Sequence, residues 1–253
     1  VKVNLVDTPG LFDFEHGVNE GIRAVENVII AVSGRSGLTV GAKKAYEKAV
    51  ALDKGRMIFI NKLDSERADF YKVLEELKTA FGPSICPLVV PVMDGHTVDC
   101  YVSLVDQKAY KYNEKGVASE VPMPDIGHRL EGLNNAVSEA VAETSEELFD
   151  KFFSGEPFTR DEIISGIHEG VKSGSITPVL GGSATELEGI DMLLDSITDH
   201  LSSAWESGSQ LAVQGDDLVE IECTDEAPLS AFIFKTIIDP FVGKLSFVKV
   251  VSG

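Results

Sequence analysis

The sequence contains little cysteine and no long apolar run across its 253 residues. Its three cysteines, Cys86, Cys100 and Cys223, are odd in number and widely spaced, so they match neither a disulfide framework nor a zinc ribbon. We expect them to be reduced thiols of a cytosolic protein. No apolar run approaches the length that crosses a bilayer, and no signal-peptide pattern opens the chain. We therefore expect a cytoplasmic protein that has no membrane partner.

Basic residues are also scarce. The chain has 22 Lys and Arg against 41 Asp and Glu, which gives a net charge of −19 at pH 7. This charge argues against binding nucleic acid through attraction to its phosphates alone. A basic protein partner or simple solubility explains the acidity better, and solubility is the simpler of the two.

The phosphate-binding pattern G-x-x-x-x-G-K-[ST] does not occur anywhere in the sequence. Val1 already stands inside an apolar run, and the last residues, "FVKVVSG", also follow a strand pattern, so we expect a fragment cut at both ends. The pattern normally supplies the cradle for the α- and β-phosphates and its lysine. We therefore expect this chain alone to bind a nucleotide poorly and to be inactive as an enzyme.

Short apolar, β-rich runs alternate with helical patterns through much of the chain. The predicted strands cover residues 1–7, 27–33, 56–62 and 176–183. The predicted helices cover residues 15–25, 39–53, 65–81 and 186–204. Strands that are apolar throughout and separated by helices indicate a parallel sheet covered on both faces.

A different pattern interrupts this alternation from residue 92 to about 170. Two strands, "CPLVVPV" and "VDCYVSLVD", precede an acidic amphipathic helix near 124–153. A second helix is expected to start where Thr159 and Glu162 have capping-box spacing. After the helix at 186–204, "SGSQLAVQGDD" is typical of a linker, and the last 25 residues, 229–253, resemble the first hairpin of a β-barrel.

The first candidate site is Asp7-Thr-Pro-Gly10, directly after the first predicted strand. Phosphate-sensing loops occupy this position in open α/β sheets. Asp7 could then contact Mg²⁺ through water, and the Gly10 N–H could reach a γ-phosphate. An ordinary strand-to-helix turn explains the same four residues about as well.

The second candidate is Asn61-Lys62-Leu63-Asp64, which follows another predicted strand. The Asp64 carboxylate could accept hydrogen bonds from the N1–H and the amino group of guanine. Adenine lacks that pattern and would leave the carboxylate unpaired. Asn61 would bind the other edge of the base, and the stem of Lys62 would lie along its face.

The third candidate is Gly182-Ser183-Ala184, whose backbone N–H groups could face the guanine O6. Each of the three motifs is weak alone. Together they occur in the order expected for guanine recognition, each at the carboxyl end of a predicted strand, and this combination favours GTP or GDP binding over coincidence.

With this order of motifs, the chain resembles bacterial elongation factor G, the translocation GTPase. The likeness includes "VNLVDTPGLFDF", "FINKLDSERADF" and "GSITPVLGGSA", and it extends to the end of the chain. The resemblance implies an α/β fold, namely a P-loop-type GTPase sheet without its P-loop portion, an inserted α+β subdomain and the start of a β-barrel. The resemblance implies that the first part of the GTPase core covers residues 1–91, the inserted subdomain 92–170 and the last part of the core 171–204. A linker at 205–228 and the first strands of the barrel at 229–253 would follow.

The resemblance also implies a site and its partners. Asn61, Lys62, Asp64, Ser183 and Ala184 would bind GTP or GDP, and Mg²⁺ would be the metal. The partner would be the ribosome, through the factor site of the large-subunit rRNA and through the stalk proteins, which the acidic insert would face. The protein would act as a monomer.

One departure concerns the residue after Gly10. The family has a histidine there that positions the attacking water, whereas this chain has Leu11, which cannot hydrogen-bond to water. Loss of a water-orienting residue generally lowers the rate by orders of magnitude. Two interpretations stay open: a ribosome-dependent GTPase whose hydrolysis is assisted by another group, and a GTP-controlled ribosome ligand that hardly hydrolyses and acts as a regulator or protection factor.

Overall fold

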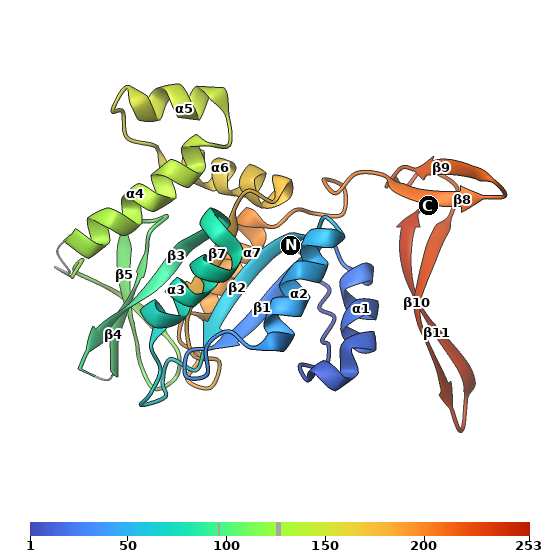
Figure 1. Cartoon of the computed structure of the whole chain (residues 1–253), viewed down its shortest axis with the longest axis horizontal. Coiled ribbons are helices and arrows are strands. Elements are labelled where there is room, and N and C mark those ends of the chain that lie inside the picture. The colour runs from blue at the N-terminus through green and yellow to red at the C-terminus, as the bar shows by residue number, and fades with distance from the viewer. Residues whose placement is uncertain (96, 125–127) are drawn as a thin grey trace. The chain divides into compact units, whose positions relative to one another are not determined.

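The structure is a computed structural model that describes residues 1–95, 97–124 and 128–253 (Figure 1). The chain forms two compact units. One comprises Val28–Leu201, and the other combines Val1–Asn27 with Ser202–Gly253. Within the described part of the chain, no helix is both long enough and apolar enough to cross a membrane.

A seven-stranded sheet forms the centre of the Val28–Leu201 unit, in the order β1-β2-β7-β3-β4-β5-β6. β7 runs parallel to its neighbours β2 and β3, whereas β3 to β6 are joined by antiparallel ladders. The strands are β1 (Asn27–Ser33), β2 (Gly55–Asn61), β3 (Ile85–Asp94), β4 (Thr97–Ser103), β5 (Lys108–Tyr112), β6 (Ala118–Val121) and β7 (Thr177–Gly181). The near-continuous burial of β2 and β7 fits strands covered on both faces, and the predicted α/β fold with a largely parallel core is confirmed.

Helices cover the sheet. They are α2 (Val40–Ala51), α3 (Phe70–Phe81), α4 (His128–Ala142), α5 (Glu146–Phe153), α6 (Arg160–Ser173) and α7 (Ile190–His200). Figure 1 shows α2 and α3 in front of the strands and α7 behind them. The helices predicted at residues 65–81 and 186–204 correspond to α3 and α7, but each prediction begins about four to five residues too early. A single apolar core runs through this unit, with Met57, Leu77 and Val179 fully buried.

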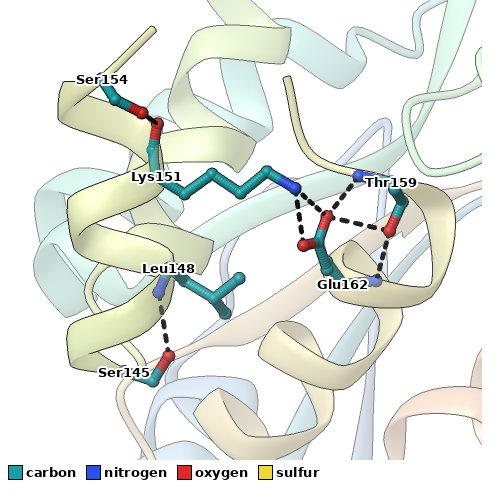
Figure 2. Close-up of polar contacts among 6 residues, drawn as sticks. All are labelled: Ser145, Leu148, Lys151, Ser154, Thr159 and Glu162. Carbon is teal, nitrogen blue, oxygen red and sulfur yellow. Dashed lines mark hydrogen bonds and ion pairs between the residues drawn. The ribbon is translucent and has the colours of Figure 1, made fainter. Parts of the chain in front are cut away.

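The capping box at the start of α6 is confirmed (Figure 2). Thr159 Oγ1 accepts a hydrogen bond from the Glu162 N–H at 3.3 Å, and Glu162 Oε2 accepts one from the Thr159 N–H at 2.6 Å. Lys151 of α5 donates to both Glu162 carboxylate oxygens, at 2.7 and 2.8 Å. The Lys151 hydrogen bond, followed by those from Thr159, lowers the pKa of Glu162 to about 2. The pair therefore joins two helices at the point where the second one begins.

The prediction of a single helix near 124–153 is wrong, because the structure has two helices, α4 and α5, in its place. Ser145 adopts an extended conformation and accepts a hydrogen bond from the Leu148 N–H at 3.2 Å, so it caps a new helix instead of continuing the old one. Residues 125–127, including Ile126 of the predicted apolar stripe, lie outside the described residues.

The second unit contains α1 (Glu15–Ala24) and two antiparallel hairpins. The hairpins are β8 (Gln210–Gln214) with β9 (Asp217–Ile221), and β10 (Ser230–Asp239) with β11 (Gly243–Ser252). The β10–β11 hairpin was predicted, but the β8–β9 hairpin occupies a segment that we expected to be a linker. Gly215 has a positive φ of 68° and forms the tight turn between β8 and β9. A polar, glycine-bearing segment is typical of such a turn as well as of a linker.

The predicted strand at residues 1–7 is absent, because the structure has no helix or strand from residue 1 to 10. A strand is stabilised by ladder hydrogen bonds to a neighbour, and these residues join none of the three sheets of the described chain. The apolar pattern therefore described a residue preference and not a paired strand. The division at residues 91, 170, 204 and 228 remains a prediction.

Candidate functional site

The loops that follow β1, β2 and β7 meet at the carboxyl end of the parallel strands. The Gly34 N–H donates to Asn61 O at 2.7 Å, and the Leu63 N–H donates to Gly182 O at 3.2 Å. The backbones approach so closely that a Cβ added to Gly34 would lie 2.7 Å from Leu63 Cδ2. Two of the three sequence-predicted motifs are thus brought together by the fold.

Asn61 joins the second of these loops to the third. Its Oδ1 accepts hydrogen bonds from the Lys62 N–H at 2.7 Å and from the Ala184 N–H at 2.9 Å. Lys62 has a positive φ of 64°, which is uncommon for a residue with a side chain. Such a conformation costs roughly 1 kcal/mol or more and is often retained at functional sites. The exposed Lys62 side chain is therefore presented by a backbone that its neighbours hold in place.

Asp64 and Ser183 form a second link between the same loops. Ser183 Oγ donates to Asp64 Oδ1 at 2.6 Å and accepts from the Glu186 N–H at 3.3 Å. Ser183 is fully buried, whereas Asp64 is exposed. The serine thus orients the carboxylate, and the carboxylate remains open to further hydrogen-bond donors from a ligand.

The backbone N–H groups of the third motif are engaged within the protein. The Ser183 N–H donates to Glu188 O at 2.9 Å, and the Ala184 N–H donates to Asn61 Oδ1. The structure therefore differs from the expectation that both groups point at a base. A ligand oxygen would have to share the Ala184 N–H with Asn61. The Ser183 N–H is engaged because Ser183 and Glu188 pair as an antiparallel bridge, which folds the loop back on itself.

Asp7, Gly10 and Leu11 lie in the other unit and are exposed. The Leu11 carbonyl accepts a hydrogen bond from the Phe14 N–H at 3.0 Å, at the short 3₁₀ helix η1 (Phe12–Phe14) that precedes α1. A Cβ on Gly21 of α1 would lie 2.3 Å from Thr8 Cγ2, so the glycine permits close packing of the helix against the segment. Gly10 has open space around it, and its φ is not positive.

The sequence pattern carried no signal for two further groups of the Val28–Leu201 unit. Glu188 accepts a hydrogen bond from the Tyr101 hydroxyl at 3.0 Å, which connects the third loop to β4. His200 is buried at the end of α7, and burial lowers its pKa to about 4. Neither residue lies in a motif, because both positions are decided by strand and helix packing. Among the described residues, no group of three or more His, Cys, Asp or Glu side chains could hold a metal ion.

A sequence comparison identifies the family to which these loops correspond. The sequence pattern of the family described as the elongation factor Tu GTP-binding domain matches residues 1–203. The chain belongs to this family. The GTP-binding domain implies a guanine nucleotide as the ligand, which agrees with the arrangement of Asn61 and Asp64.

Two relatives extend the likeness beyond this GTP-binding domain. An elongation factor G-like protein of Thermotoga maritima is 36% identical over 253 residues, with 100% of this chain and 36% of that protein covered. A crystal structure of a Thermus thermophilus protein matches with a TM-score of 0.82 at 30% identity, over 98% of this chain and 35% of that one. The chain thus spans about a third of the length of these relatives.

Proposed function

We propose that this chain supplies the base-reading and γ-phosphate-sensing parts of an elongation factor G-like, translocation-type GTPase that acts on the ribosome and converts GTP to GDP and phosphate. The observation that carries the proposal is the Ser183–Asp64 hydrogen bond of 2.6 Å, which holds an exposed carboxylate between two loops of a GTP-binding domain. An orienting hydrogen bond of this kind prepares the carboxylate for a ligand that donates two hydrogen bonds.

Base selection follows from the hydrogen-bonding groups. Asp64 would accept from the guanine N1–H and amino group, and the stem of Lys62 would lie along the face of the base. Adenine has an acceptor at N1 and no amino group at C2, so it would leave Asp64 without a donor. A site built to hydrogen-bond its ligand generally rejects an analogue that leaves a polar group unpaired. Asn61 acts mainly by tying the Ala184 backbone to the same loop.

The γ-phosphate side would use Asp7 and Gly10. Asp7 is an exposed carboxylate, and Mg²⁺ prefers oxygen ligands and keeps several waters, so one carboxylate that acts through water fits this ion. Mg²⁺ supplies charge neutralisation on the phosphates of a bound nucleotide. The Gly10 N–H would contact the γ-phosphate, and the open space around this glycine allows a change in its peptide orientation.

A second candidate function rests on Leu11. Its side chain is 68% exposed and has no group that orients water, so the protein would bind GTP and the ribosome yet hydrolyse slowly, as a regulator or protection factor. In both functions the partners would be the factor site of the large-subunit rRNA and the stalk proteins. A net charge of −19 favours basic protein partners, and the protein would act as a cytoplasmic monomer.

The test is GTP turnover by the full-length protein that contains this sequence, with and without 70S ribosomes, beside the Leu11→His variant. Strong ribosomal stimulation of the natural protein would support the enzyme and assign water positioning to another group. Tight GTP binding without stimulated turnover, restored by histidine, would support the regulator. Failure to bind GTP or GDP would overturn both.

A further inference from the structure

Two tyrosines from the antiparallel strands contact the loop that carries Ser183 and the start of α7. Tyr101 of β4 is 1% exposed, and its hydroxyl donates to Glu188 Oε2 at 3.0 Å. Tyr112 of β5 donates to Asp191 Oδ1 at 2.5 Å. The two rings pack edge to face with their centroids 5.7 Å apart. Both ends of the segment from Glu188 to Asp191 are thus held by neighbouring strands.

The turn between β5 and β6 makes a third contact with this loop. Gly116 has a φ of 69°, and a Cβ at this position would lie 2.4 Å from Leu187 Cβ and 3.2 Å from Glu186 O. Leu187 itself has a positive φ of 61°. A side chain at residue 116 would therefore displace a loop residue that already has an unusual backbone conformation.

A short path leads from these contacts to Asp64. Glu188 and Ser183 exchange two backbone hydrogen bonds, of 2.9 and 3.0 Å, and Ser183 Oγ donates to Asp64. Burial raises the pKa of Glu188, and the charges of Glu186 and Asp64 raise it further, whereas the Tyr101 hydrogen bond lowers it. The Tyr101 hydroxyl thus stabilises a carboxylate that burial and like charges disfavour.

We propose that Tyr101 is a positioning residue for guanine recognition, which acts through Glu188 on the Ser183–Asp64 pair, so that the antiparallel strands β4 to β6 set how tightly and how selectively the base is held. This inference rests on the proposed guanine-nucleotide site.

The test compares Tyr101→Phe with Tyr71→Phe in the full-length protein. Tyr71 is a matched control because its hydroxyl also donates one partly buried hydrogen bond, to Pro91 O at 2.9 Å, but its partner lies on β3 and not in the loop. The first measurement is amide hydrogen exchange at residues 183–189. The second is the dissociation rate of GDP and of IDP, whose base lacks the amino group that Asp64 would bind.

We expect Tyr101→Phe to accelerate amide exchange at Ala184 and Glu188 and GDP dissociation about three- to tenfold, the effect of one lost hydrogen bond. The preference for GDP over IDP should fall with it, which a loss of stability alone would not cause. Glu188→Gln, which keeps an acceptor for Tyr101, should stay close to the parent, and Glu188→Ala should match Tyr101→Phe. The double variant Tyr101→Phe/Glu188→Ala should be no worse than either single variant.

Equal exchange and equal GDP-to-IDP preference in the Tyr101 and Tyr71 variants would overturn the inference alone, since the parent would still bind GDP. Faster loop exchange with an unchanged preference would also overturn it, because the loop would then move without consequence for the base. A parent protein that binds no guanine nucleotide would overturn the proposed function, and the inference with it.

Discussion

The loop at residues 61–64 and the segment at residues 5–11 both combine apolar residues with a short polar motif, yet their surroundings differ. Leu63 is 3% exposed and lies among loops that hydrogen-bond to one another, whereas Leu5 is 80% exposed and belongs to no sheet. β2, which leads into the motif at residues 61–64, has a strand on each side. The difference teaches that a motif acquires a defined geometry from its neighbouring strands, and not from its own sequence.

The largest expected effect tests whether the loop at residues 61–64 binds the base. Asp64→Asn in the full-length protein should weaken GDP binding at least about 100-fold, since hydrogen bonds to a charged group contribute about 1.5–3 kcal/mol each. Xanthine has a carbonyl oxygen where guanine has its amino group, and an asparagine amide can donate to it. We therefore expect XDP to bind the variant better than GDP, as measured by competition with a fluorescent nucleotide.

The neighbouring Glu66→Gln is the matched control, because it also removes one exposed negative charge from the loop. Its GDP affinity should change less than about threefold, as expected for an exposed charge. Equal losses in the two variants would mean that Asp64 acts through the general field of the loop and does not contact the base.

The next effect compares the two leucines directly. In the 253-residue chain, Leu63→Ala should lower the free energy of unfolding by about 2–5 kcal/mol, because it leaves a cavity between packed loops. Leu5→Ala should change it by less than about 0.5 kcal/mol, as expected for an exposed position. Urea denaturation followed by circular dichroism measures both. A large effect at Leu5 would show that the leading segment is buried after all.

The same comparison explains what could be predicted from sequence. Local signals were reliable: the Thr159 and Glu162 spacing predicted a capping box that the structure contains, and the apolar runs of β1, β2 and β7 predicted the parallel core. The strand at residues 1–7 failed because pairing depends on a neighbour. The long helix failed because the Ser145 side chain caps a new helix, a choice that the apolar stripe does not reveal.

The loops of the site were predicted as to position but not as to hydrogen bonding. The motifs indicated which residues gather at the carboxyl ends of β2 and β7. They did not indicate that the Ala184 N–H is engaged by Asn61, or that Tyr101 reaches Glu188, because these contacts join residues 123 and 87 positions apart. Contacts of such sequence separation are decided by packing and not by local pattern.

A third effect concerns His200, in the unit that also holds the base-reading loops. Burial lowers its pKa to about 4 in the folded state, against 6.5 for an unperturbed histidine, so from pH 6.5 down to 4 only the unfolded chain takes up this proton. The free energy of unfolding should therefore fall by about 3 kcal/mol across this window. His200→Gln, which does not titrate, should lack this slope when both proteins are unfolded in urea at several pH values.

Glu188 and Asp195 have raised pKa values and act in the opposite direction, because the folded state takes up their protons first as the pH falls. Subtracting the variant's profile from that of the parent removes their contribution. A difference that stays constant from pH 7 to pH 4 would mean that folded His200 binds its proton as readily as the unfolded chain does.

The smallest effect asks whether the two units lose structure separately. Thr159 and Asp239 each accept backbone hydrogen bonds through a side-chain oxygen, Thr159 at the start of α6 and Asp239 from the Phe241 and Val242 N–H groups in the β10–β11 turn. Thr159→Ala should destabilise the Val28–Leu201 unit by about 1 kcal/mol. Asp239→Ala should affect only the other unit, because its hydrogen bonds are local to an exposed turn.

Two signals can follow the two units separately. Trp205, the single tryptophan, lies in the same unit as Asp239, so its fluorescence reports the unfolding of that unit, while helical circular dichroism reports mainly the unfolding of the Val28–Leu201 unit. If Thr159→Ala shifted the tryptophan transition as much as the helical one, the two units would unfold as one cooperative body. The contrast between the motifs at residues 61–64 and 5–11 would then reflect local strand pairing alone. It would not reflect two units of different stability.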